Sequence, residues 1–187
     1  MGLEKARESL ADAEEAAGRI LSAKDNQTIR KAWSDFLIYF NRTIGRVEGA
    51  ANAHKSPQWW NQVKAQRKSD AFLQYAHHAR NADEHGIAEI TEPQPFEFKV
   101  GRPDETVYIE HFSMRDGVVN AKIHGGTVMA HSGSIVLIPV VDRGQTYRPP
   151  VPLAPRLYPT PAFVVENAMP MLRDIVSQAE KQPLKPV

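Results

Sequence analysis

One stretch of this 187-residue chain, residues 29–47, constrains the fold more than any other. Its apolar side chains follow one another at intervals of 4, 3, 1, 3, 4 and 3 residues, the repeat of an amphipathic helix with one buried face. They are Ile29, Trp33, Phe36, Leu37, Phe40, Ile44 and Val47. The pattern predicts a helix that ends near Glu48-Gly49, and its aromatic residues are interpreted as core rather than as a ligand-binding box.

Helical patterns also flank this stretch. Residues 2–24 carry alanine-rich apolar positions at heptad spacing, which predicts a closely packed helix. Ser56-Pro57 is typical of a helix start, with a serine cap and proline at the first position. The helix that follows is expected to break or bend at Ser69-Asp70 and to resume through His85, with Pro93 as the latest end.

The pattern changes after Pro93. Alternating or β-rich runs predict a small antiparallel sheet, with a hairpin turn at Asp116-Gly117. The predicted strands are residues 96–100, 106–114, 118–123, 127–130 and 134–141. Residues 142–160 are rich in proline and are expected to form an extended strap. Thr160-Pro161 then predicts a last helix, which runs to about residue 180.

These predictions define an α+β protein. An antiparallel helical bundle, residues 1–92, is followed by a β-rich module with a proline-rich strap and a closing helix, residues 93–187. The absence of cysteine excludes disulfides, thiolate metal sites and thiol nucleophiles. No apolar run approaches the roughly 18 residues of a membrane span, and the charged N-terminus has no signal-peptide core. We therefore expect a cytoplasmic protein without membrane contact.

Positive charge is concentrated between Arg42 and Arg80. The segment holds seven Lys and Arg residues and two acidic residues, Glu48 and Asp70, so its net charge is +5. Such a segment can bind phosphates, or it can be an ordinary helix face exposed to solvent. The residues expected to contact RNA are Lys64, Arg67, Lys68, His77 and His78.

The densest group of chemically capable side chains is Arg80-Asn81-Ala82-Asp83-Glu84-His85. In a helical context this Arg-Asn-x3-His run resembles the motif of the HEPN superfamily, as does the helical first half of the chain. The resemblance implies a metal-independent endoribonuclease without a cofactor, in which the ribose 2′-hydroxyl attacks the adjacent phosphate. It further implies that His85 is the general acid/base, that Arg80 holds the phosphate and that Asn81 orients one of them.

The resemblance also bears on partners. It implies that the protein binds RNA, which is expected to be single-stranded. It also implies a toxin or defence setting. In that setting a cognate antitoxin would be a further partner, which the sequence does not identify. Arg80 and His85 stand five residues apart, about 140° around a regular helix. Two copies of the motif at a two-fold axis would resolve this divergence, so we expect a homodimer.

Other interpretations remain open at the level of sequence. The domain can be a non-catalytic RNA-binding or protein-interaction scaffold, because HEPN-like domains with such roles are known. Arg80 and Glu84 can be an ordinary ion pair between residues i and i+4, with His85 facing the helix dipole. The histidine-rich run lacks a standard zinc spacing, so no metal is predicted. His124-Gly125-Gly126 is interpreted as a turn rather than an oxyanion loop.

Overall fold

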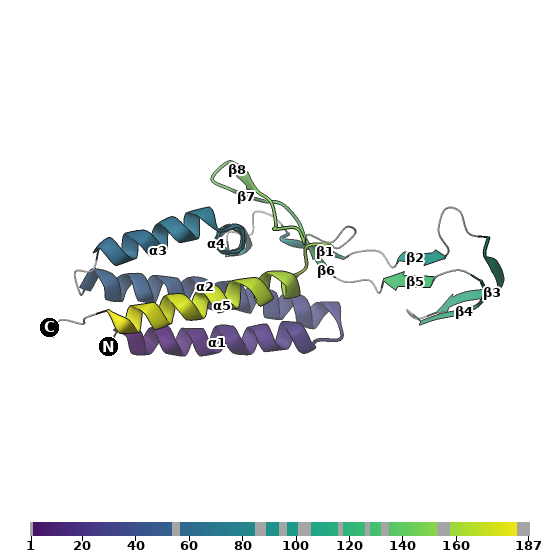
Figure 1. Ribbon diagram of the computed structural model, residues 1–187, viewed down its shortest axis with the longest axis horizontal. Coiled ribbons are helices and arrows are strands. Elements are labelled where there is room, and N and C mark those ends of the chain that lie inside the picture. Colours follow the sequence, from purple (N-terminus) through teal and green to yellow (C-terminus); the bar gives the residue numbers. More distant parts are fainter. Residues whose placement is uncertain are drawn as a thin grey trace. The chain divides into compact units, whose positions relative to one another are not determined.

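Two long helices joined by a short turn begin the chain: α1 (Gly2–Ser22) and α2 (Asn26–Ala53). The turn is stabilised by Asp25, whose Oδ1 accepts a hydrogen bond from the Thr28 amide at 2.8 Å. Two ion pairs join α1 to α5 (Pro161–Lys181), Arg7 with Glu180 and Glu14 with Arg173, so these two helices run antiparallel. α3 (Pro57–Ser69) and α4 (Ala71–Glu84) lie against α2, and α4 also contacts α5 (Figure 1).

This computed structural model describes residues 2–53, 57–84, 89–93, 97–100, 106–115, 118–125, 128–131, 135–152 and 158–182. The predictions for His85 and for the Asp116-Gly117 turn lie outside these residues. Within them the chain is α+β, with long helices, small antiparallel sheets and a C-terminal helix, as the sequence predicts.

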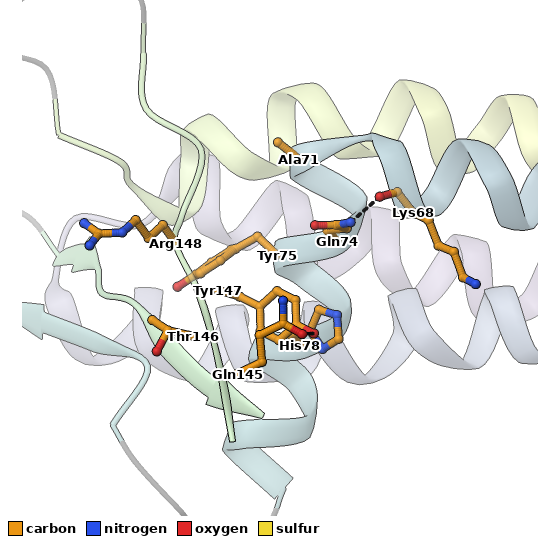
Figure 2. A pocket seen from close by; sticks show the side chains of 9 residues that line it. All are labelled: Lys68, Ala71, Gln74, Tyr75, His78, Gln145, Thr146, Tyr147 and Arg148. Atoms are coloured by element: carbon orange, nitrogen blue, oxygen red, sulfur yellow. Dashed lines mark hydrogen bonds between the residues drawn. The ribbon is translucent and has the colours of Figure 1, made fainter. Parts of the chain in front are cut away.

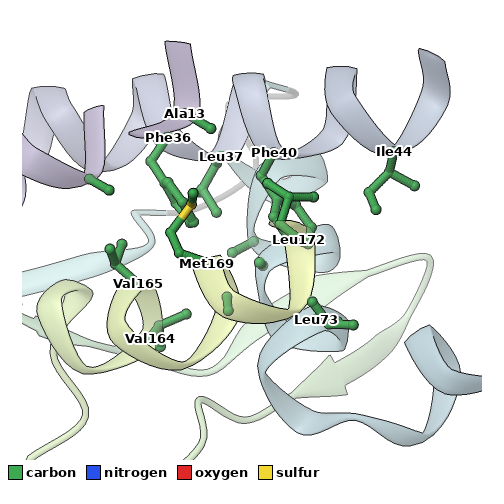
Figure 3. Close-up of a cluster of buried hydrophobic side chains, with 14 of the residues drawn as sticks. Ala13, Phe36, Leu37, Phe40, Ile44, Leu73, Val164, Val165, Met169 and Leu172 are labelled. Atoms are coloured by element: carbon green, nitrogen blue, oxygen red, sulfur yellow. The ribbon is translucent and has the colours of Figure 1, made fainter. Parts of the chain in front are cut away.

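The core lies where α1, α2, α4 and α5 meet. Figure 3 shows side chains of these helices converging, among them Phe36, Phe40, Leu73 and Leu172, all fully buried. Burying a side chain of this size contributes about 1.5–3 kcal/mol. The predicted apolar face of residues 29–47 is therefore the centre of the bundle.

Each pair of neighbouring strands is antiparallel. β1 (Thr91–Pro93) pairs with β6 (Ile135–Leu137), and β7 (Val140–Asp142) pairs with β8 (Gln145–Tyr147). β2 (Glu97–Val100) pairs with β5 (Val128–His131). β3 (Tyr108–Arg115) pairs with β4 (Val118–His124), the hairpin that the sequence predicts.

The chain divides into two compact units, and their bounds differ from the predicted division at residues 92 and 93. One unit comprises residues 1–93 and 135–187, and the other comprises residues 94–134. α5 belongs to the first unit because Val164, Leu172 and Ile175 are fully buried in the helical core. Packing between segments that are distant in sequence, which local patterns do not report, sets these bounds.

Several element ends differ from the predictions. α2 continues through Gly49 to Ala53, because Ala50 and Ala51 are buried and this packing outweighs the helix cost of glycine, about 1 kcal/mol. The run 134–141, predicted as one strand, is interrupted between β6 and β7 at Ile138-Pro139. The strap predicted from residue 142 onward begins instead with β7 and β8, which form a hairpin.

Candidate functional site

The β7–β8 hairpin lies against α4, and local chemistry explains its shape. Arg143 and Gly144 link the strands with φ angles of 52° and 77°, the left-handed pair of a two-residue hairpin turn. The buried Tyr75 of α4 donates its hydroxyl to the main-chain oxygen of Ile138, at 2.8 Å. This bond fixes the chain just before β7, and so it places Asp142 beside α4.

Asp142 accepts hydrogen bonds from two side chains of α4. Its Oδ2 accepts hydrogen bonds from His78 Nδ1 at 2.7 Å and from Asn81 Nδ2 at 2.8 Å. Both bonds favour the carboxylate, Asn81 most strongly, and they lower the pKa of Asp142 below its ordinary value. Since His78 donates through Nδ1 when it is neutral, its Nε2 carries a lone pair that can accept a proton.

Arg80 extends the same network. Its Nη1 donates to Asn81 Oδ1 at 3.3 Å, and its Nη2 forms an ion pair with Glu84. The Arg80 Nε is buried and has no acceptor among the residues that the structure describes. A continuous set of hydrogen bonds therefore runs from His78 through Asp142 and Asn81 to Arg80. The i, i+4 pair with Glu84 that the sequence allowed is present.

His77 lies beside His78 but has a different environment. Its Nδ1 donates to Asn41 Oδ1 at 2.8 Å, and the Asn41 amide nitrogen donates in turn to Leu37 O. Burial, followed by the positive charge of Arg67, lowers the pKa of His77 from 6.5 to about 4. His77 is therefore neutral at pH 7 and is a weak proton acceptor.

The three basic residues of α3 are not equivalent. Lys64 and Lys68 are exposed, whereas Arg67 is half-buried. Burial lowers the pKa of Arg67, and the nearby carboxylate of Glu48 opposes this effect. Of the residues predicted to contact RNA, Lys68 and His78 line one pocket together, and Lys64, Arg67 and His77 do not line it.

That pocket lies between α3, α4 and β8 and has a volume of about 550 Å³. It is lined by Lys68, Ala71, Gln74, Tyr75, His78, Gln145, Thr146, Tyr147 and Arg148, with no carboxylate among them (Figure 2). In the part of the chain described here, neither Lys68 nor Arg148 forms an ion pair. The Tyr147 ring stacks on the His78 ring with centroids 3.4 Å apart and planes 11° apart. The lining thus favours an anionic ligand.

Sequence reasoning found the α4 side of this site and missed the β8 side. The proline-rich pattern of residues 142–160 predicts instead that Asp142, Tyr147 and Arg148 belong to an extended strap. Arg143-Gly144 after a β-rich run is the signal that could have predicted a hairpin there. Even so, the pairing of Asp142 with Asn81, 61 residues apart, has no local signal.

His85 lies outside the described residues, so the structure places Arg80 and Asn81 of the motif but not its histidine. Within the described ranges there is no cluster of three or more residues able to hold a metal ion. Among the same residues no helix is both long and apolar enough to cross a bilayer. No family model, curated protein or solved structure matches this chain.

Proposed function

We propose that the protein is a metal-independent endoribonuclease, in which the ribose 2′-hydroxyl attacks the adjacent phosphate and leaves a cyclic phosphate. The observation that carries the proposal is the network from Arg80 and Asn81 through Asp142 to His78. It lies beside a pocket whose described lining has no carboxylate, and whose two cations form no ion pair with any described residue. These groups match what the reaction needs: donors for a phosphate, a proton acceptor and an attraction for a polyanion.

Arg80 has the role of holding the scissile phosphate. A guanidinium can offer two parallel N–H groups to phosphate oxygens, and the Arg80 Nε already lacks an acceptor among the described residues. Because Glu84 occupies Nη2, RNA must displace this partner to reach the bidentate arrangement. The pair is half-exposed, and such pairs contribute about 0–1 kcal/mol, so a phosphate can replace it at small cost.

Asn81 and His85 complete the proposed site. Asn81 is held by Asp142 on one side and by Arg80 on the other, which suits a residue that orients its neighbours. The role of His85 as general acid/base is carried from the HEPN resemblance and from the spacing Arg80-Asn81-x3-His85.

The test is RNA cleavage in EDTA by the wild type and by the Arg80→Ala and His85→Ala variants. Each variant should lose at least about a hundredfold in rate, the usual contribution of general acid–base catalysis or of a phosphate contact. His111→Ala is the control, because His111 is exposed on β3 in the other unit. Undiminished cleavage by both variants would overturn the proposal, and activity that EDTA abolishes would indicate a metal-dependent reaction instead.

A second candidate function is RNA binding without cleavage, or a scaffold role. The observation that favours it is the Arg80–Glu84 ion pair, which satisfies part of the guanidinium without any substrate. Tight binding of a single-stranded RNA by a wild type that leaves it intact would select this alternative.

A further inference from the structure

Cleavage by 2′-hydroxyl attack needs a base that removes the hydroxyl proton. A suitable base has a free lone pair, a fixed orientation and access to a space that holds RNA. His77 lacks the basicity, because its pKa is lowered to about 4, and it does not line the pocket. His78 meets each requirement: Nδ1 is engaged by Asp142, Nε2 is left with its lone pair, and the residue lines the pocket.

We propose that His78 is the general base of the reaction, and that the pocket between α3, α4 and β8 holds the RNA strand whose 2′-hydroxyl it deprotonates. This inference rests on the proposed ribonuclease function. Asp142 is a positioning residue, because it fixes the His78 ring and its tautomer through Nδ1 and does not itself touch the substrate.

The cleavage step needs no reactant other than the RNA, groups of this chain and water. The 2′-hydroxyl proton moves to His78 Nε2 as the 2′-oxygen forms a bond to phosphorus. The bond from phosphorus to the 5′-oxygen breaks, and the departing 5′-oxygen takes a proton from the general acid, the role that the proposed function gives to His85. His78 then returns its proton to solvent, and the products are a 2′,3′-cyclic phosphate end and a free 5′-hydroxyl end.

The pocket suits part of a single RNA strand. A volume of about 550 Å³ falls within the range of small-ligand sites, roughly 300–1,000 Å³. Figure 2 shows Lys68 and Arg148 on opposite sides of the pocket, with His78 and the stacked Tyr147 between them. Lys68 and Arg148 can contact backbone phosphates of the strand other than the scissile one, which Arg80 holds, and an aromatic ring is a common partner of unpaired bases.

The kinetic test compares two substrates: a diribonucleotide and a ribonucleoside 3′-(4-nitrophenyl phosphate). The nitrophenyl ester needs no acid for its leaving group, although it still needs a base for the 2′-hydroxyl. His78→Ala should therefore lose about a hundredfold or more on both substrates. His78→Gln keeps a donor for Asp142 and controls for folding, and it should lose as much. Recovery of His78→Ala on the nitrophenyl ester would make His78 an acid and overturn the proposal.

The positioning role of Asp142 has its own readout. In Asp142→Asn the amide oxygen can take the place of Oδ2 and accept from both Asn81 and His78 Nδ1, so the fold is kept. The negative charge that stabilises the His78 ring once it has taken up the proton is removed. We expect kcat to fall at least about tenfold with KM little changed. A rise in KM and a fall in kcat, together with loss of thermal stability, would show a merely structural role and contradict this part.

Binding is measured separately, by fluorescence anisotropy with a 2′-O-methyl oligoribonucleotide that cannot be cleaved. Lys68→Ala and Arg148→Ala should each weaken affinity and flatten its salt dependence, whereas Lys31→Ala on the exposed face of α2 should not. Equal affinities for all three would overturn the pocket assignment. A wild type that does not cleave RNA would overturn the proposed function, and the inference with it. Cleavage that needs Arg80 but not His78 would overturn the inference alone.

Discussion

Replacing His77 with glutamine should make folding stability less sensitive to mild acid. Burial lowers the pKa of His77 to about 4 in the folded protein, whereas the unfolded chain has the ordinary value of 6.5. As pH falls below 6.5 the unfolded chain therefore binds a proton first. The stabilisation is present at pH 7 and is lost as pH falls through 6.5 towards 4. Glutamine removes the titration and keeps an N–H donor for Asn41 Oδ1.

The magnitude follows from these two pKa values. Between pH 7 and pH 5 the linkage relation gives a loss of about 1.8 kcal/mol for a group with this full shift. The His77 side chain is partly exposed, so solvent screening reduces the expected loss to about 1 kcal/mol.

Urea unfolding at pH 7 and pH 5 measures this loss directly. The wild type should lose about 1 kcal/mol more than His77→Gln between the two pH values. His111→Gln is the matched control, because His111 is exposed, and it should behave as the wild type. Equal losses in the wild type and His77→Gln would refute the view that His77 is neutral and hydrogen-bonded in the fold.

Three other outcomes are expected. Tyr75→Phe leaves the main-chain oxygen of Ile138 without its hydroxyl donor, so it should lower the free energy of unfolding in urea titrations by about 1–2 kcal/mol. A change below about 0.3 kcal/mol would contradict this hydrogen bond. Joint replacement of the three basic residues of α3 by alanine should weaken RNA binding and reduce its dependence on salt, and unchanged affinity would mark a solvated face. The residues replaced are Lys64, Arg67 and Lys68. If two chains share each site, mixing Arg80→Ala with His85→Ala should restore about a quarter of the activity, and a cleaving monomer by light scattering would contradict the homodimer.

The helical half was predictable because its signals are local. The apolar repeat of residues 29–47 forms one buried face, as its spacing predicts. Thr160 caps α5 as its sequence pattern predicts, because its Oγ1 accepts a hydrogen bond from the Phe163 amide at 3.2 Å. The predicted break at Ser69-Asp70 is also confirmed, because Asp70 Oδ1 accepts the Leu73 amide at 2.9 Å and begins α4. Periodicity and capping residues lie within a few positions of the structure that they specify.

The candidate site was predictable in part, for the same reason. Asn81 stands three residues after His78 on α4, so sequence spacing places these two on one face of the helix, and Arg80 joins them through its bond to Asn81. Asp142, which joins His78 to Asn81, comes from a hairpin whose packing on α4 depends on Tyr75 and Ile138, 63 residues apart. Such long-range contacts arise from the collapse of the whole unit, and no local pattern reports them.

The most direct test of the ribonuclease claim is analysis of the RNA ends produced by the purified protein in EDTA. A single-stranded RNA should be cut to fragments with 2′,3′-cyclic phosphate and 5′-hydroxyl ends, and Arg80→Ala and His85→Ala should abolish these ends. Intact RNA after incubation with a folded wild type, or cyclic phosphate ends that persist in both variants, would contradict the account.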